Sequence, residues 1–202
     1  MFNGTQYSLP PLFLSHFSWS RAVKDNVWFT YKARIKAQER LEWMDFHSQN
    51  LLVWYAILSA VVATLTIRYP DLLGKDTDLL TTVLSIFLLA ISLSVANRDF
   101  RGRAILMRRN YQRLHRLYST MNGPSASPAE IETYSNLLRD CENHKSIDDI
   151  LARIGSNNLT SREPSTKEVI VGYGVLIRRY ALTGLLYIAP VIVAASFWIQ
   201  SQ

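Results

Sequence analysis

Cysteine is almost absent from this sequence of 202 residues, and the single Cys141 excludes an internal disulfide. The same scarcity excludes a cysteine-based zinc site, which needs several thiolates. A chain without disulfides suits a reducing compartment. Residues 1–20 show no basic start followed by an apolar core, so the sequence predicts no cleavable signal peptide. We expect residues 1–20 to form an irregular tail.

Catalytic and cofactor-binding motifs are also missing. The sequence has no Gly-x-Gly-x-x-Gly fingerprint, no phosphate-binding loop and no nucleophile elbow. Its four histidines are scattered without metal-ligand spacing, at His16, His47, His115 and His144. We therefore expect no enzymatic activity, no catalytic residues, no metal and no cofactor.

Long stretches without any charge are what the sequence has instead. Residues 51–67 and 79–96 are uncharged, and a turn with Pro70 and Gly74 separates them. A third uncharged stretch covers residues 181–199. Each stretch is close to the roughly 20 residues that a bilayer-crossing helix needs. The first two predict a transmembrane hairpin, with a buried hairpin in a soluble helical bundle as the alternative, and the third predicts a C-terminal span.

The remaining segments predict amphipathic helices, so the expected fold class is an all-α integral membrane protein. Apolar residues recur at helical spacing in residues 21–47 and again in residues 97–120, which we expect to continue the second span as a helix. Ser127 opens a capping box for a helix to about Arg153, and Ser165 opens a second box before the last helix. These helices are expected to be cytosolic.

We expect the chain to divide into three parts. Residues 1–20 form the tail, residues 21–154 form a domain around the hairpin, and residues 155–202 hold a polar linker, an amphipathic helix and the C-terminal hydrophobic helix. Pro190 lies inside that last helix. A membrane helix tolerates proline when a neighbour bonds the carbonyl that the proline leaves without a partner.

The net charge of +6 is distributed unevenly, and this predicts orientation. The turn at residues 68–78 carries two basic and three acidic residues, whereas residues 21–47 carry six basic residues and residues 97–120 carry seven. Cytoplasmic flanks of membrane spans are enriched in lysine and arginine. The N-terminus and residues 97–180 are therefore predicted to be cytoplasmic, and the turn is predicted to lie outside.

The arginines after the second uncharged stretch need an explanation of their own. The simplest is that they anchor the span and face anionic lipid head groups. Tyr111, His115 and Tyr118 interleave with them, a mixture that also suits phosphates and stacked bases, so direct nucleic-acid binding is the less favoured alternative. Our candidates for membrane anchoring or partner binding are Arg98, Arg101, Arg108, Arg109 and Arg113.

Hydroxyl side chains form a weakly polar stripe along the second predicted span. Ser85 and Ser92 are seven residues apart, and Thr81 lies near the same helix face. Small hydroxylated residues serve as contacts between membrane helices. The same three residues are candidates for lining a pore, and the spacing does not decide between these roles. One protomer has too few spans to enclose a channel, so a pore requires self-assembly.

The densest polar cluster is Glu142, Asn143 and His144, with two aspartates close behind. On a continuous helix, Glu142 and Asp149 would share one face. A solvated helix face is the simplest interpretation. The functional alternative is a cytosolic motif that contacts a partner, a nucleotide or a neighbouring subunit. Hydrolysis is disfavoured because no nucleophile or metal set accompanies the cluster.

Three segments together resemble a known family. A basic helix, YKARIKAQERL (31–41), leads into the hairpin, which ends in ANRDFRGRA (96–104), and a later segment reads CENHKSIDDI (141–150). This arrangement resembles the SLATT superfamily of two-transmembrane bacterial effectors, and most of all its family five. The resemblance covers residues 20–155 and the C-terminal hydrophobic segment. The third predicted span departs from a superfamily whose name counts two.

The resemblance implies a membrane effector of bacterial antiphage and conflict systems, located in the inner membrane. It implies that copies oligomerise to form a pore or to depolarise the membrane. The implied triggers are a nucleotide second messenger or an associated reverse transcriptase. The expected partners are therefore the lipid bilayer, further copies of the chain and one of these triggers. The alternative is a membrane adaptor that recruits a cytosolic enzyme or nucleic acid without forming a pore.

Overall fold

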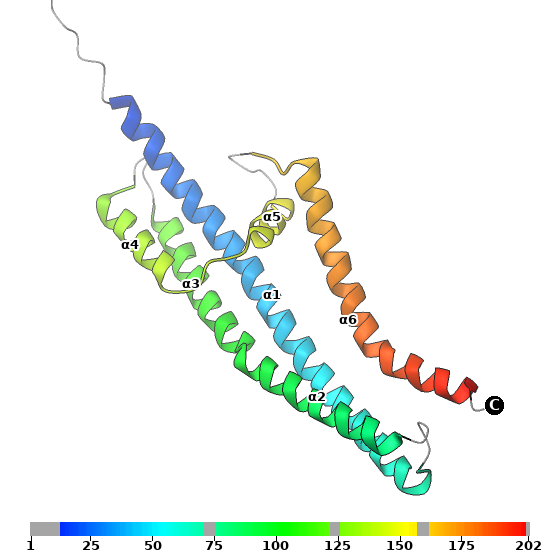
Figure 1. Cartoon of the computed structure of the whole chain (residues 1–202). Helices are drawn as coiled ribbons and strands as arrows, with labels where there is room; N and C mark the ends of the chain where they lie inside the picture. Colours follow the sequence, from blue (N-terminus) through cyan, green and yellow to red (C-terminus); the bar gives the residue numbers. More distant parts are fainter. Residues whose placement is uncertain (1–12, 71–75, 122–125, 157–161, 201–202) are drawn as a thin grey trace, which may run out of the picture. The chain divides into compact units, whose positions relative to one another are not determined.

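The computed structural model describes residues 13–70, 76–121, 126–156 and 162–200, and every regular element in these ranges is an α-helix (Figure 1). In chain order the helices are α1 (Phe13–Arg68), α2 (Thr77–Asn97), α3 (Phe100–Thr120), α4 (Pro128–Arg139), α5 (Ser146–Ile154) and α6 (Thr166–Gln200). The predicted all-α fold class is confirmed.

Three of the helices, α1, α2 and α6, are long and apolar enough to cross a membrane. Their most apolar 18-residue windows bury none of their residues inside the chain. Large side chains such as Leu84, Phe87 and Ile188 are more than half exposed. A contiguous apolar surface of this extent is unfavourable in water and is favourable against lipid. The alternative of a hairpin buried in a soluble bundle is therefore wrong.

Helix α1 is a single helix where the sequence predicted a tail, an amphipathic helix and a separate span. Residues 13–20 are already helical, in contrast to the irregular tail expected over residues 1–20. Residues 1–12 lie outside the described residues. The sequence has no proline or glycine between Phe13 and Arg68, so nothing in this stretch forces the helix to stop.

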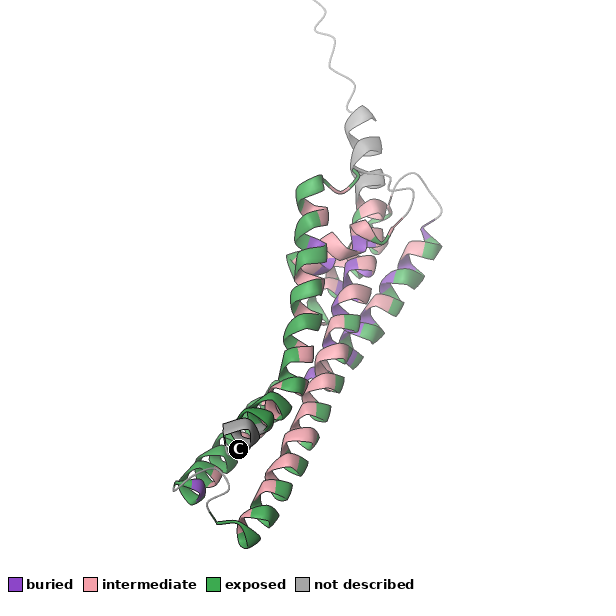
Figure 2. Ribbon diagram, turned by 90° about the vertical axis from the view of Figure 1, so that its right-hand side faces the viewer, coloured by how far each residue is buried: buried purple, intermediate pink, exposed green. Residues whose placement is uncertain are grey.

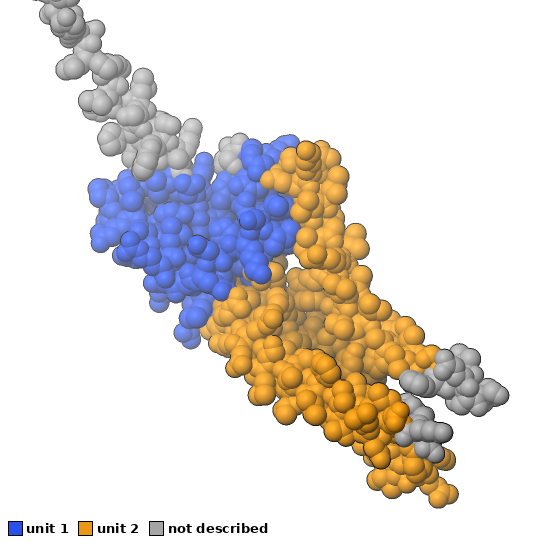
Figure 3. Space-filling view, in the orientation of Figure 1, with its two compact units in different colours: residues 1–37, 106–164 blue, residues 38–105, 165–202 orange. Residues whose placement is uncertain are grey.

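Contacts divide the chain into two compact units (Figure 3). The first unit consists of Met1–Ala37 and Leu106–Pro164, and the second of Gln38–Ile105 and Ser165–Gln202. Helices α1 and α3 each contribute residues to both units. The first unit contains α4 and α5, and the second contains α2 and α6.

A small apolar core holds the first unit together. Val27 and Tyr31 of α1 pack with Leu114 and Leu117 of α3 and with Leu137 of α4. The spacing of four residues on α1 and three on α3 places each pair on one helix face. Burying a side chain of this size contributes about 1.5–3 kcal/mol. Figure 2 shows buried residues along these helices, whereas the apolar windows of α1, α2 and α6 hold intermediate and exposed residues.

Both predicted capping boxes are confirmed. The Glu130 N–H donates to Ser127 Oγ at 3.3 Å, and the Ser127 N–H donates to Glu130 Oε2 at 2.7 Å. At the start of α6, Ser165 and Glu168 exchange the same two bonds, at 3.3 and 2.8 Å. Each box satisfies two N–H groups that a helix start would otherwise leave without partners.

The helix expected from residue 128 to about residue 153 is in fact two helices. α4 ends at Arg139 and α5 begins at Ser146, with residues 140–145 between them. The Lys145 N–H donates to the Asp148 carboxylate at 2.8 Å, which provides a new helix start. Glu142 therefore lies within the break and does not share a continuous helix face with Asp149. The prediction of a common face was wrong.

A second break separates α2 from α3, where one continuous helix was expected. Asp99 has φ of 41°, a left-handed conformation that aspartate tolerates better than most residues. Its carboxylate accepts the Gly102 N–H at 3.0 Å and so caps the start of α3. A Cβ on Gly102 would lie only 2.2 Å from Asp99 Oδ2, so glycine leaves room for this cap.

Two residues of α3 that follow this break, in the second unit, pack against α1. Phe100 and Ala104 of α3 are buried against Leu41 of α1, with Met44 beside them. The Phe and the last Ala of the ANRDFRGRA segment are thus explained by contact with α1.

Candidate functional site

The three residues of the hydroxyl stripe on α2, in the second unit, differ in how far they are buried. Thr81 and Ser92 are partly buried, on the α2 face that also carries the buried Thr77, whereas Ser85 is exposed. The hydroxyls of Thr81 and Ser85 donate to backbone carbonyls of their own helix at 3.1 and 2.9 Å. These bonds reduce the cost of placing the hydroxyls in an apolar environment. Thr81 and Ser92 fit contacts between helices, and Ser85 fits contact with lipid or with another copy.

Pro190 is accommodated in α6 by a neighbouring helix. Proline lacks an N–H and so leaves the carbonyl four residues earlier, that of Leu186, without its usual helical bond. The Tyr55 hydroxyl of α1 donates to this carbonyl at 2.9 Å. The expectation that a neighbour bonds the freed carbonyl is confirmed, and the bond links α6 to α1 at a defined register.

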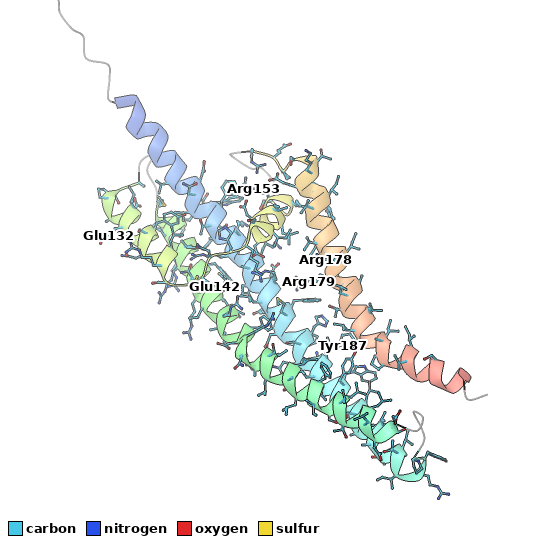
Figure 4. The ribbon with its side chains drawn as sticks, viewed as in Figure 1. Glu132, Glu142, Arg153, Arg178, Arg179 and Tyr187 are labelled. Atoms are coloured by element: carbon cyan, nitrogen blue, oxygen red, sulfur yellow. The ribbon has the colours of Figure 1, made fainter. Side chains whose placement is uncertain are left out.

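An aromatic and cationic cluster continues this contact along α1 and α6. The Arg179 guanidinium lies 3.7 Å from the centre of the Trp43 ring, within range for a cation–π interaction. Trp43 also meets Tyr180 edge-on, with ring centres 6.0 Å apart, and His47 meets Tyr187 at 6.1 Å. Figure 4 labels Arg178, Arg179 and Tyr187 on α6. Aromatic and basic residues in this combination are typical of a membrane–water interface.

A groove of about 560 Å³ lies among α1, α2 and α6 in the second unit. Its lining is almost wholly apolar, with Tyr55 and Ser59 from α1, Thr81 and Phe87 from α2, and Pro190 from α6. The sequence did not predict this groove, because it depends on how α6 packs against the hairpin.

All five candidate arginines are exposed. Arg98 and Arg101 belong to the second unit and the other three to the first. Arg113 forms a salt bridge of 3.1 Å with Asp140, and both side chains are exposed, so the pair contributes at most about 1 kcal/mol. Their exposure is compatible with binding lipid head groups or a partner, and it does not discriminate between these two predictions.

The Glu142–Asn143–His144 motif lies between α4 and α5, where Figure 4 labels Glu142. Glu142 and Asn143 are exposed, whereas His144 is half-buried, and its Nδ1 has no partner among the described residues. Burial lowers the pKa of His144 below its usual 6.5, with a smaller lowering by Arg34 and opposing effects of Asp149 and Asp148. The imidazole is therefore neutral at neutral pH.

Arg34 is the polar centre of the first unit, although it is not among the site residues predicted from the sequence. Its side chain is fully buried in α1. It donates to the Asn110 side chain of α3 and to the carbonyls of Leu137 and Leu138, at 3.1 and 3.4 Å for the two carbonyls. These carbonyls belong to the last turn of α4, where a cation is favourable for the helix dipole.

Burial lowers the pKa of Arg34, but a guanidinium stays charged at any physiological pH. Burial also raises the pKa of the neighbouring Cys141, so its thiol stays protonated and unreactive. One sequence signal could have identified Arg34: it follows Tyr31 by three residues and Val27 by seven, which places it on the buried stripe of α1.

A second hollow, of about 360 Å³, lies between α1 and α3 in the first unit. Its walls are Tyr31, Ile35, Tyr111, His115 and Arg116, together with Gln112. Aromatic rings beside an arginine suit a planar anionic ligand or a peptide side chain. Among the described residues, no group of three or more His, Cys, Asp and Glu side chains could hold a metal ion.

A chain whose described residues form only helices, three of them of membrane-crossing length and composition, is a membrane protein. The chain belongs to the SMODS and SLOG-associating 2TM effector domain family 5, whose model matches residues 17–196. The match confirms the resemblance to SLATT family five. It extends over most of α6, although the family description counts two spans. No curated protein and no solved structure is significantly similar to the chain.

Proposed function

We propose that this chain is an effector that self-assembles in the bacterial inner membrane and breaches it, by forming a pore or by depolarising the membrane. The N-terminus and residues 97–180 face the cytoplasm in this proposal, as the distribution of basic residues favours. The trigger is a nucleotide signal or an associated reverse transcriptase. The family description, which associates these effectors with SMODS and SLOG domains, supports a signalling context.

The exposure of most of the surface of α2 is the observation that best supports the proposal. Only one narrow face of α2 packs within the chain, and the rest is exposed, including Ser85 and Ser94. The groove among the spans is apolar, so a single copy offers ions no polar path through it. An ion path would therefore have to form between copies, with one polar face of α2 directed toward it.

The first experiment measures membrane potential and dye entry in bacteria that express the chain, alone and with its genomic neighbours. We expect rapid depolarisation that depends on the chain. Ser85→Leu is expected to insert normally and to abolish depolarisation, because leucine removes the exposed hydroxyl of the stripe from the predicted path. Ser94→Leu is the matched control, since Ser94 is also exposed but lies about 180° around the helix from Ser85. Undiminished depolarisation by Ser85→Leu, at equal membrane levels, would exclude Ser85 as part of a pore lining.

A membrane adaptor is the second candidate function, and the hollow beside Tyr111, His115 and Arg116 favours it. In this case the exposed arginines recruit a cytosolic enzyme or nucleic acid and no pore forms. Replacing Arg108, Arg109 and Arg113 by glutamine separates the two functions. Loss of partner capture with normal depolarisation supports a pore-former that also binds a partner. An intact membrane potential during a working immune response supports the adaptor alone.

A further inference from the structure

We propose that the second unit contains a binding site for one anionic phospholipid. An acyl chain occupies the groove among α1, α2 and α6, and the phosphate lies near Arg178. The site goes beyond the proposed effector function and does not depend on whether a pore forms.

The width of the possible occupants favours an acyl chain over a helix from another copy. An α-helix with its side chains is about 10 Å wide, whereas an extended acyl chain is much thinner. An acyl chain can therefore enter a groove of about 560 Å³ between three helices without separating them. The groove lies on helices that cross the membrane, so hydrocarbon chains are the molecules available to fill it.

The chemistry of the lining also favours hydrocarbon. The Tyr55 hydroxyl is bonded to the Leu186 carbonyl, and the Thr81 hydroxyl is bonded to the Asp78 carbonyl. Both hydroxyls thus have their donors engaged within the protein. Ser59 adds one further hydroxyl, and the other lining residues have apolar side chains. Water in a cavity needs two or more polar partners, which such a lining supplies poorly. The small side chains of Ser59 and Ala189 leave space where larger residues would fill the groove.

The position of Arg178 fits the phosphate of the same lipid. Arg178 is exposed and precedes Ala189, a groove residue, by 11 residues of α6. Eleven residues rise about 16 Å and return to within about 20° of the same helix face. Half the hydrocarbon thickness of a bilayer is about 15 Å, so Arg178 lies at head-group depth when Ala189 lies near the middle. Beside it, Arg179 stacks on Trp43 and adds positive charge.

The test uses the full chain purified in detergent and offered phosphatidylglycerol or phosphatidylcholine. Native mass spectrometry measures the fraction of chains that retain one phospholipid. Two variants fill the groove, Ala189→Phe and Ser59→Leu, and Ala90→Phe is the matched control because Ala90 is exposed on α2 outside the groove. Arg178→Gln tests the phosphate contact. Its control is Arg68→Gln, because Arg68 is the last residue of α1, at the end predicted to lie outside. Circular dichroism checks that each variant is helical.

We expect the wild type to retain phosphatidylglycerol in preference to phosphatidylcholine. Both groove-filling variants lose the retained lipid while the Ala90 variant keeps it. Arg178→Gln reduces the preference for phosphatidylglycerol by about five-fold, the effect of one basic residue near an anionic head group. Equal retention by a helical groove-filling variant and the wild type overturns the acyl-chain site. An unchanged preference in Arg178→Gln overturns the phosphate contact.

Discussion

A fully buried arginine organises the first unit at the level of single residues. Arg34 places a charge among Asn110 and the carbonyls that end α4, and a buried charge is tolerated only when its hydrogen bonds are made. Asn110 Nδ2 also donates to the Leu137 carbonyl, at 2.7 Å. One side chain from α1 and one from α3 therefore hold the end of α4 by bonding carbonyls that lack helical partners there.

Replacing Arg34 by methionine should destabilise the first unit. The variant keeps most of the side-chain volume but leaves the Leu138 carbonyl and the Asn110 side chain without their donor. We expect a loss of about 2–4 kcal/mol in the free energy of unfolding. Thermal unfolding of the detergent-solubilised chain measures the change. Arg139→Met, at an exposed arginine of α4, is the control, and an equal effect of both variants would contradict the role of Arg34.

His144 should make stability depend on pH. Because burial lowers its pKa in the folded state, the unfolded chain binds the proton more readily. Its contribution to stability is therefore complete above the unfolded pKa of about 6.5 and is lost as pH falls through the lower folded pKa. Asp148, Asp149 and Arg34 also shift the pKa of this imidazole. All three residues stay in place when His144 alone is replaced, so effects on stability that do not involve His144 are the same with and without the replacement.

The measurement compares thermal stability of the wild type and His144→Gln between pH 7.5 and pH 5. We expect the wild type to lose more stability than the variant as pH falls below about 6.5. Parallel pH profiles for the two proteins would show that His144 is not the titrating group.

At the level of elements, the bond between α1 and α6 depends on Pro190. Tyr55 donates to the Leu186 carbonyl, which proline has left without a helical partner. In Pro190→Ala that carbonyl regains a backbone N–H within α6. The hydroxyl of Tyr55 and the ring of Pro190 should therefore be energetically coupled.

A double-mutant cycle tests this coupling. We expect Tyr55→Phe to destabilise the wild type by about 0.6–2 kcal/mol, the range for hydrogen bonds between membrane helices. The same change should cost much less in the Pro190→Ala background. Unfolding in mixed detergent micelles measures all four proteins, and equal costs in both backgrounds would show that the two residues act independently.

At the scale of the whole molecule, crossing of the membrane by all three candidate helices would put the two ends of the described chain on opposite sides. Single cysteines in a Cys141→Ser background test this topology. In spheroplasts, a membrane-impermeant maleimide should label Asp76→Cys and Gln200→Cys from outside, and Ser165→Cys only after permeabilisation, as the distribution of basic residues predicts. Protection of Gln200→Cys together with labelling of Asp76→Cys would show that α6 does not cross the membrane.

The sequence by itself determined the class of this protein and the starts of α4 and α6. Uncharged stretches of about 20 residues predict spans because the cost of placing charge in hydrocarbon is local to each segment. The boxes at Ser127 and Ser165 are equally local, since each acts within one helical turn. The ANRDFRGRA and CENHKSIDDI segments were enough to identify the family.

Only the tertiary structure decided which polar residues are buried and what they contact. Arg34 meets a carbonyl 103 residues away, and Tyr55 meets one 131 residues away, so neither contact has a local signature. The same contacts stabilise the end of α4, because a side chain from α1 bonds carbonyls that the helix end leaves without helical partners. The difference in burial between the exposed Ser85 and the partly buried Thr81 and Ser92 also depends on how the helices pack. Periodicity places residues on a helix face, but the neighbours that cover that face come from distant segments.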